Sequence, residues 1–483
     1  FQEVEQLNLF KDMVCYQEEV RDPSRMAEVL NRVIEKAIRG SAPAQINVPR
    51  DYWTQVIDID LPPIVRLERQ AGGVDAIKKA ADLLSKAKFP VILSGAGVVI
   101  GGAIEECKKL AEKLDAPVCS GYQHNDSFPG SHPLAAGPLG YNGSKAGMEL
   151  ISKADVVLAL GTRLNPFSTL PGYGIDYWPK NANIIQVDIN SDRIGLTKKV
   201  TVGICGDAKL VANQIFEQLS PNAGDSDRQK RKDIIHQTKS AWLQKLSSLD
   251  HEDDDEGTVW NKEARERDKD RMSPRQAWRA IQAGMPDDVI ISSDIGNNCA
   301  IGNAYPTFEK PRKYLAPGLF GPCGYGFPSI LGAKIGCPDT PVIGFAGDGA
   351  FGISMNEMSS CARKEWPAIS MVIFRNYQWG AEKRNTTLWF DDNFIGTELD
   401  PELSYSKVAD ACGLKGVTVK TMDETTAAIK QSCEDQKKGI TTFIEVILNQ
   451  ELGEPFRRDA MKKPVKVAGI NKADMKPQKS LNG

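Results

Sequence analysis

The first stretch of the chain shows the pattern of one amphipathic helix followed by one short strand. In residues 23–40 the apolar positions recur at intervals of three and four, as on one face of a helix. These positions are Met26, Val29, Leu30, Val33, Ile34 and Ala37. Pro23 and Gly40 are typical of a helix start and end. The sequence AQINVP at 44–49 predicts a short strand that ends at Pro49. One helix and one strand bury too little surface for a domain, so residues 1–52 are expected to be the C-terminal remnant of one.

The next block, residues 72–220, alternates helical and continuous apolar segments. Runs such as VILSG at 91–95 and VVLAL at 156–160 are uninterrupted, as expected for parallel strands buried on both faces. Residues 74–88 and 103–114 predict helices. Alternating strands and helices indicate a parallel sheet covered on both faces, so the fold class predicted here is a doubly wound α/β domain.

The same alternation returns in residues 273–450. The strands predicted there are 289–296, 341–349, 368–376 and 441–448. The stretch at 221–272 that separates the two blocks is strongly charged with mixed signs, which favours a solvated helix and linker. The tail, 451–483, is basic and poor in apolar residues, which indicates a loosely ordered arm or, alternatively, an arm packed over a site.

Composition and charge narrow the function classes. Hydrophobic residues are 41% and charged residues 25% of the 483, which is ordinary for a globular protein. No apolar run reaches about 18 residues, so no membrane span is expected. The net charge of −3 offers no basic field for nucleic acid. The ten cysteines form no CxxC pair, which argues against a zinc ribbon and favours reduced thiols in the cytoplasm.

Candidate chemistry lies at two strand ends. Asp348 and Asn376 each follow a predicted strand and are joined by a helix, and the right-handed crossover brings both strand ends to one edge of the sheet. Gly347 and Gly349 let a ligand approach the backbone. Carboxylate and amide oxygens suit Mg²⁺, which takes its other ligands from phosphates and water. The pattern predicts a metal-held diphosphate cofactor; the alternative is an ordinary turn and an unrelated Asn.

This segment resembles the signature of the thiamine-diphosphate-dependent enzymes, in which Gly-Asp-Gly is followed, after a helix and a strand, by Asn. The resemblance implies that Asp348, Asn376 and the backbone carbonyl of Gln378 hold Mg²⁺ on the diphosphate of the cofactor. The spacing is one residue longer than the most common form of the signature. Arg375 stands where the family usually has a first Asn.

Two further segments share the resemblance. Residues 292–300 resemble the loop that wraps the diphosphate, and 316–328 resemble the Gly-rich stretch that contacts the aminopyrimidine. Cys323 takes the place of a bulky apolar residue that props the cofactor, although a plain core role is the alternative. The expected cofactor-binding residues are Gly296, Asn297, Asn298, Gly321, Cys323, Gly347, Gly349 and Ala350.

The resemblance covers essentially the whole chain. It implies the end of a pyrimidine-binding domain at 1–52, a central domain at 72–220 and a diphosphate-binding domain at 273–450. Residues 376–400 look most like those of one particular acyltransferase in the acetolactate-synthase-like branch of the family. This similarity implies an acyltransferase that converts sulfoacetaldehyde and phosphate to acetyl phosphate and sulfite, downstream of taurine. Residues after Arg163 depart from the pattern of the FAD-using relatives, so no FAD is expected.

Both substrates are anionic, so cations are expected near them. Lys383 and Arg384 follow the metal loop and are the candidates, with solvated surface charges as the alternative. Trp379 is expected either to wall the pocket or to pack in the core. Gln2 belongs to a Phe-Gln-Glu segment that resembles one near the active site of acetolactate synthases.

The chain starts at Phe1 without a signal peptide and is expected to be a fragment. The Glu that activates the cofactor is expected on a preceding segment, so no catalytic residue is assigned. Two alternatives to this interpretation remain open. One is an acetolactate-synthase-like carboligase of 2-oxo acids, and the other is an inactive cofactor-binding remnant. The family resemblance also implies a homodimer or homotetramer.

Overall fold

The computed structural model describes residues 3–63, 68–173, 175–225, 227–249, 268–318, 320–363, 365–389 and 393–451. The chain divides into two compact units, Phe1–Glu68 and Arg69–Gly483. Apart from Glu451, the predicted basic tail lies outside the described residues. Within the described ranges, no helix is both long and apolar enough to cross a membrane.

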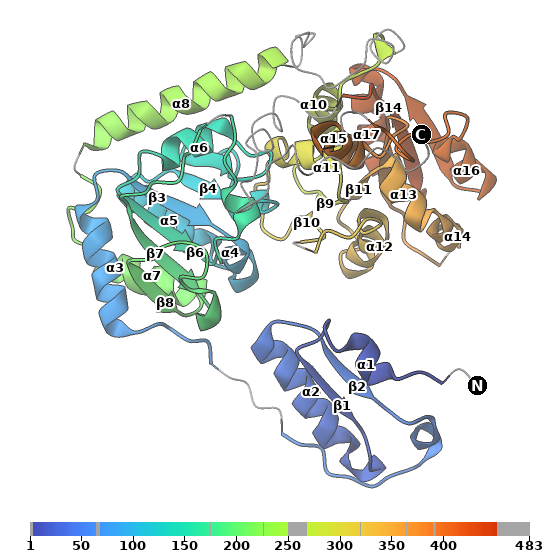
Figure 1. The fold of residues 1–483 in the computed structure, drawn as a ribbon, viewed down its shortest axis with the longest axis horizontal. Coiled ribbons are helices and arrows are strands. Elements are labelled where there is room, and N and C mark those ends of the chain that lie inside the picture. The colour runs from blue at the N-terminus through green and yellow to red at the C-terminus, as the bar shows by residue number, and fades with distance from the viewer. Residues whose placement is uncertain are drawn as a thin grey trace, which may run out of the picture. The chain divides into compact units, whose positions relative to one another are not determined.

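The first unit is built on a parallel pair of strands, β1 (Tyr16–Glu19) and β2 (Ala44–Asn47). The helix α2 (Met26–Gly40) connects them, and α1 (Gln6–Phe10) precedes them (Figure 1). The predicted helix and the predicted strand are both present, but the prediction missed α1 and β1. The strand β1 has the sequence YQEE and no fully buried side chain, so it leaves no apolar pattern to detect.

The second unit contains two six-stranded sheets, and every strand pair in both is parallel. The first sheet has the order β5-β4-β3-β6-β7-β8. Its strands are β3 (Pro90–Ser94), β4 (Val118–Ser120), β5 (Ala135–Pro138), β6 (Val156–Leu160), β7 (Asn183–Asp188) and β8 (Val202–Cys205). Its helices are α3 (Val74–Lys86), α4 (Ala96–Gly101), α5 (Ile104–Leu114), α6 (Lys145–Ile151) and α7 (Ala208–Gln218). The two edge strands, β5 and β8, were not predicted, because they are only partly buried.

The second sheet, yellow to red in Figure 1, has the order β10-β9-β11-β12-β14-β13. Its strands are β9 (Ile290–Ser293), β10 (Tyr314–Leu315), β11 (Val342–Gly347), β12 (Ser370–Arg375), β13 (Lys415–Val419) and β14 (Thr442–Ile447). Its helices are α10 (Pro274–Gly284), α11 (Asn297–Ile301), α12 (Gly326–Gly336), α13 (Asp348–Ser354), α14 (Met358–Cys361), α15 (Gly380–Trp389), α16 (Tyr405–Ala411) and α17 (Met422–Lys437). These two sheets confirm the predicted class of successive parallel α/β domains.

The charged stretch between the sheets contains α8 (Arg228–Leu249), and residues 250–267 lie outside the described residues. The helix is not solvated all round, because Arg231, Trp242 and Leu246 are buried. Four backbone carbonyls accept hydrogen bonds from the guanidinium of Arg231. A buried cation with this many acceptors fixes the helix to the end of α5 and to two loops beside the sheet.

The strand order of the second sheet creates a crevice at one place. After β9 the chain adds β10 on one side and then crosses to form β11 on the other. The loops that leave β9 and β11 therefore diverge at their carboxyl ends. Such switch points are where open α/β sheets bind ligands, so the fold itself places a candidate site after Ser293 and Gly347.

Candidate functional site

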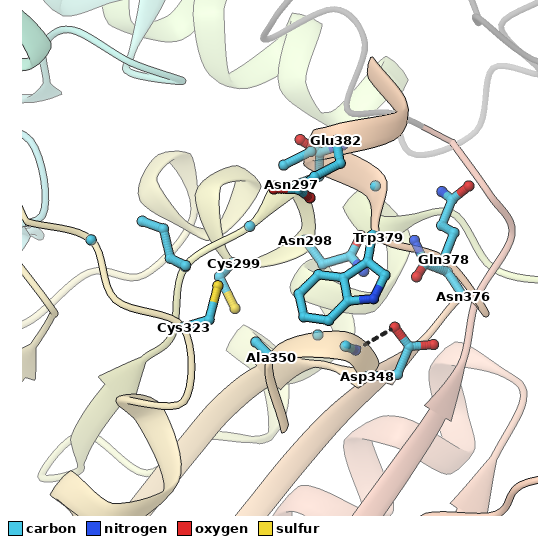
Figure 2. Close-up of a pocket in the computed structure, with 17 residues that line it drawn as sticks. Asn297, Asn298, Cys299, Cys323, Asp348, Ala350, Asn376, Gln378, Trp379 and Glu382 are labelled. Atoms are coloured by element: carbon cyan, nitrogen blue, oxygen red, sulfur yellow. Dashed lines mark hydrogen bonds between the residues drawn. The ribbon is translucent and has the colours of Figure 1, made fainter. Parts of the chain in front are cut away.

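A cavity of about 210 Å³ opens at the carboxyl ends of β9, β11 and β12 (Figure 2). Loops from the three strands and the Gly-rich segment before α12 contribute to its walls. The lining residues are Ile295, Gly296, Asn297, Asn298, Cys299, Gly321, Cys323, Gly347, Asp348, Gly349, Ala350, Asn376, Gln378, Trp379, Gly380, Ala381 and Glu382. All eight residues predicted to bind the cofactor and all three predicted to bind the metal are among them.

Asp348 is the first residue of α13 and is buried. Its Oδ1 accepts a hydrogen bond from the backbone N–H of Gly349 at 3.0 Å. Its Oδ2 accepts from the N–H of Tyr377 at 2.7 Å and faces Nη1 of Arg375 at 3.1 Å. Burial raises the pKa of the Asp348 carboxyl to about 6, although Arg375 opposes the shift. A carboxylate destabilised by burial is a favourable place for a cation.

The loop after β12 turns sharply at Tyr377, whose φ is 61°. A tyrosine seldom adopts this left-handed conformation, and here its N–H is directed to Asp348. The turn separates Asn376 from Gln378, and both side chains are buried. Asn376 Oδ1 and Gln378 Oε1 have no hydrogen-bond partner among the described residues. The loop therefore contributes two buried oxygens that have no partner among the described residues.

The loop after β9 adds further unused polar atoms. Asn297 and Asn298 begin the short helix α11, and both are buried. Within the described part of the chain, Oδ1 and Nδ2 of Asn297 and Oδ1 of Asn298 lack partners. Leaving a buried polar atom unpaired costs about 1–3 kcal/mol. Five such atoms around one cavity fit a polar occupant, and their mixture of oxygens and an N–H donor fits a metal-bound diphosphate.

Asp294 holds together two of the segments that line the cavity, although it was not among the predicted site residues. Its buried carboxylate accepts hydrogen bonds from the N–H groups of Ile295, Gly324 and Gly326, at 2.8, 3.1 and 2.7 Å. It thus links the loop after β9 to the Gly-rich segment. Cys323, in that segment, is partly buried and lines the cavity (Figure 2), and burial raises the pKa of its thiol.

The predicted substrate residues are distributed unevenly around this cavity. Trp379 lines it and is partly buried (Figure 2). Lys383 is not among the lining residues, and its ammonium pairs with Glu398. Gln2 and the side chain of Arg384 lie outside the described residues.

Two more residues at the site had no signal in the sequence. Glu382 lines the cavity near Asn297 (Figure 2). Gln450, just after β14, donates from Nε2 to the carbonyl of Asn376 at 3.2 Å, and its own carbonyl accepts from Gln378 Nε2 at 3.1 Å. Since Gln450 is 74 residues from Asn376, no local pattern could have predicted this contact.

Two protein-family descriptions match the chain. One is "Thiamine pyrophosphate enzyme, central domain", over residues 77–215, which include the first six-stranded sheet. The other is "Thiamine pyrophosphate enzyme, C-terminal TPP binding domain", over residues 294–446, which include the cavity. Together they match more than half of the chain. The chain belongs to the thiamine pyrophosphate enzyme family.

Within this family the similarity extends to individual enzymes. The "Probable sulfoacetaldehyde acetyltransferase" of Rhizobium meliloti is 77% identical over 481 residues, which are 100% of this chain and 81% of the relative. The "Sulfoacetaldehyde acetyltransferase" of Roseovarius nubinhibens is 73% identical, over 99% of this chain and 79% of the relative. The crystal structure of benzoylformate decarboxylase from Polynucleobacter necessarius superposes with a TM-score of 0.71 at 19% identity, covering 93% of this chain and 78% of that one. This last likeness concerns the fold alone.

Proposed function

We propose that this protein converts sulfoacetaldehyde and phosphate to acetyl phosphate and sulfite, using thiamine diphosphate and Mg²⁺. The main support is the 77% identity to a probable sulfoacetaldehyde acetyltransferase over the whole chain. The cavity at the carboxyl ends of β9, β11 and β12 supports the cofactor assignment, because its unpartnered polar atoms need a polar occupant.

The proposed metal ligands are Asp348, Asn376 and the backbone carbonyl of Gln378. A carboxylate and two neutral oxygens leave room for phosphate oxygens and water, as Mg²⁺ prefers. Gly296, Asn297 and Asn298 would bind the diphosphate, together with Gly347, Gly349 and Ala350 at the start of α13. Gly321 and Cys323 would contact the remainder of the cofactor from the Gly-rich segment.

When bound, thiamine diphosphate supplies the carbon nucleophile that the protein itself lacks. The residues of this chain then bind and orient the reactants. Trp379 forms an apolar wall that excludes water beside the metal site, which strengthens the electrostatic interactions there. Lys383, Arg384 and Gln2 are proposed to contact the anionic substrates. Lys383 would first have to exchange its ion pair with Glu398 for the substrate.

The wider assignments follow the family and the chemistry of the chain. We assign the end of a pyrimidine-binding domain to 1–52, a central domain to 72–220, a diphosphate-binding domain to 273–450 and a basic tail to 451–483. A homodimer or homotetramer is proposed from the family, and a role in taurine breakdown from the substrate. All ten cysteines fall within the described ranges and are free. Free thiols are typical of a reducing compartment, which supports the cytoplasm.

The experiment uses the full-length gene product that carries this sequence, supplied with thiamine diphosphate and Mg²⁺. Sulfite and acetyl phosphate are measured from sulfoacetaldehyde, and acetolactate is measured from pyruvate in parallel. The proposal predicts phosphate-dependent acetyl phosphate and no acetolactate. Acetolactate alone would indicate a carboligase of 2-oxo acids, and binding of the cofactor without either product would indicate an inactive protein.

A further inference from the structure

A buried arginine stands directly behind the proposed metal site. Arg375 is the last residue of β12 and is 0% exposed, and Asp348 is 1% exposed. Arg375 Nη1 lies 3.1 Å from Asp348 Oδ2. A positive charge this close to a metal ligand weakens the attraction of the ligand for a cation, so its presence needs a compensating role.

Arg375 is held by contacts that do not involve Asp348. Its Nη2 donates to the carbonyl oxygens of Asp400 and Leu403, the latter at 2.8 Å. Its Nε lies 3.6 Å from Oε1 of the buried Glu445. The guanidinium also lies 5.4 Å from the centre of the Tyr405 ring. Because the rest of the fold fixes the guanidinium, Asp348 adapts to Arg375 rather than the reverse.

The two carboxylate oxygens of Asp348 are consequently unequal. Oδ2 accepts hydrogen bonds from both Arg375 Nη1 and the backbone N–H of Tyr377. Among the described residues, Oδ1 accepts a hydrogen bond from Gly349 N–H alone. A carboxylate oxygen can accept two, so Oδ1 keeps a lone pair for another ligand. The orientation of the carboxylate is therefore set before any ligand binds.

We propose that Arg375 is a positioning residue that fixes Asp348 for one-sided coordination of Mg²⁺ through Oδ1. This inference rests on the proposed metal site. Mg²⁺ demands near-ideal octahedral geometry, whereas Ca²⁺ tolerates irregular ligands. Arg375 would thus favour Mg²⁺ by denying the metal a bidentate carboxylate.

The test replaces the guanidinium but keeps its charge. In Arg375→Lys, an ammonium cannot reach Asp348, Asp400, Leu403 and Glu445 at once. Thiamine diphosphate binding to the metal-free protein is titrated by calorimetry at increasing Mg²⁺, and again at increasing Ca²⁺. We expect the half-saturating Mg²⁺ concentration to rise by about 10-fold or more, the lower end of the range for residues that orient metal ligands. The Ca²⁺ value should rise less than 3-fold.

Arg231→Lys is the matched control, since Arg231 is buried as well and donates to four backbone carbonyls that lie outside the cavity. It should lower the melting temperature and leave both metal titrations unchanged. If Arg375→Lys behaves in the same way, Arg375 is merely structural and the inference is wrong. Should Arg375→Lys not fold, Glu445→Gln is the second variant, because it weakens the contact of Glu445 with Arg375 Nε. Unchanged Mg²⁺ dependence in Glu445→Gln would equally overturn the inference. Failure of the wild type to bind thiamine diphosphate would instead refute the proposed function.

Discussion

The indole of Trp379 lies against Gly349 so closely that a Cβ at this glycine would stand 2.8 Å from the ring. Gly349 is the second glycine of the Gly-Asp-Gly turn that begins α13. Its lack of a side chain serves the packing of an aromatic wall as well as the approach of a ligand to the backbone. Figure 2 shows the ring above this turn, inside the cavity.

Replacing Gly349 with Ala should displace the ring of Trp379. A rigid indole cannot yield at 2.8 Å, and such overpacking costs about 1–3 kcal/mol. We expect weaker thiamine diphosphate binding, by about 10-fold, and a changed tryptophan emission spectrum. Gly332→Ala in α12 is the control, because a Cβ there meets nothing within 4 Å. Unchanged emission and affinity in Gly349→Ala would refute the packing argument.

Replacing Asp348 with Asn should abolish Mg²⁺-dependent binding of thiamine diphosphate. The change keeps the shape of the side chain and removes its charge. Since outer-shell changes at metal sites already cost 10- to 100-fold, we expect a loss of at least about 100-fold in a calorimetric titration. Asp207→Asn provides a control, because Asp207 caps α7 and Asn caps helices equally well. Wild-type affinity in Asp348→Asn would remove this residue from the metal site.

Cofactor binding should weaken in acid. Burial raises the pKa of Asp348 to about 6, and a proton and Mg²⁺ compete for the same carboxylate. Below pH 6 the apparent affinity for Mg²⁺ should fall about tenfold per pH unit, and above pH 7 it should be constant. The measurement is a series of Mg²⁺ titrations between pH 5 and 8. The association of Mg²⁺ with free thiamine diphosphate, measured without protein, corrects for titration of the cofactor. A corrected affinity that stays flat from pH 5 to 7 would contradict the assignment.

Replacing Asp294 with Asn should loosen the Gly-rich segment. The carboxylate of Asp294 accepts three backbone N–H groups, and an amide would turn an NH₂ group toward at least one of them. Hydrogen bonds to charged groups contribute about 1.5–3 kcal/mol each, so urea unfolding should show a loss of about that size. The exposed Asp410, which accepts a hydrogen bond from Gly416 N–H, offers the comparison variant Asp410→Asn. Equal losses in both variants would argue against a special role for Asp294.

Two features could be predicted from sequence. One is the position of the central strands, and the other is the proximity of Asp348 and Asn376 at one edge of the sheet. Residues 341–349 and 368–376 contain β11 and β12, because a strand buried on both faces shows as a continuous apolar run. The crossover rule then brings Asp348 and Asn376 to one edge, and both line the cavity. Both features depend only on neighbouring residues and on one topological rule.

The remaining features depend on contacts that local patterns do not encode. Asp294 bonds to glycines 30 and 32 residues further along the chain. The pairing of Lys383 with Glu398 is equally invisible in sequence, since each residue alone suggests a solvated surface charge. The strand β10 has two residues and gives no periodicity at all. The pattern of apolar residues along the sequence thus predicts the strands and helices of the scaffold. The partners of the charged residues can be identified only from the folded structure.

The most direct measurement is the product ratio from sulfoacetaldehyde, using the full-length gene product loaded with thiamine diphosphate and Mg²⁺. Sulfite and acetyl phosphate are quantified over time with and without inorganic phosphate. The proposed reaction predicts one acetyl phosphate for each sulfite, with turnover that ceases when phosphate is omitted. Sustained sulfite release without phosphate, or no sulfite from a protein shown to bind the cofactor, would contradict it.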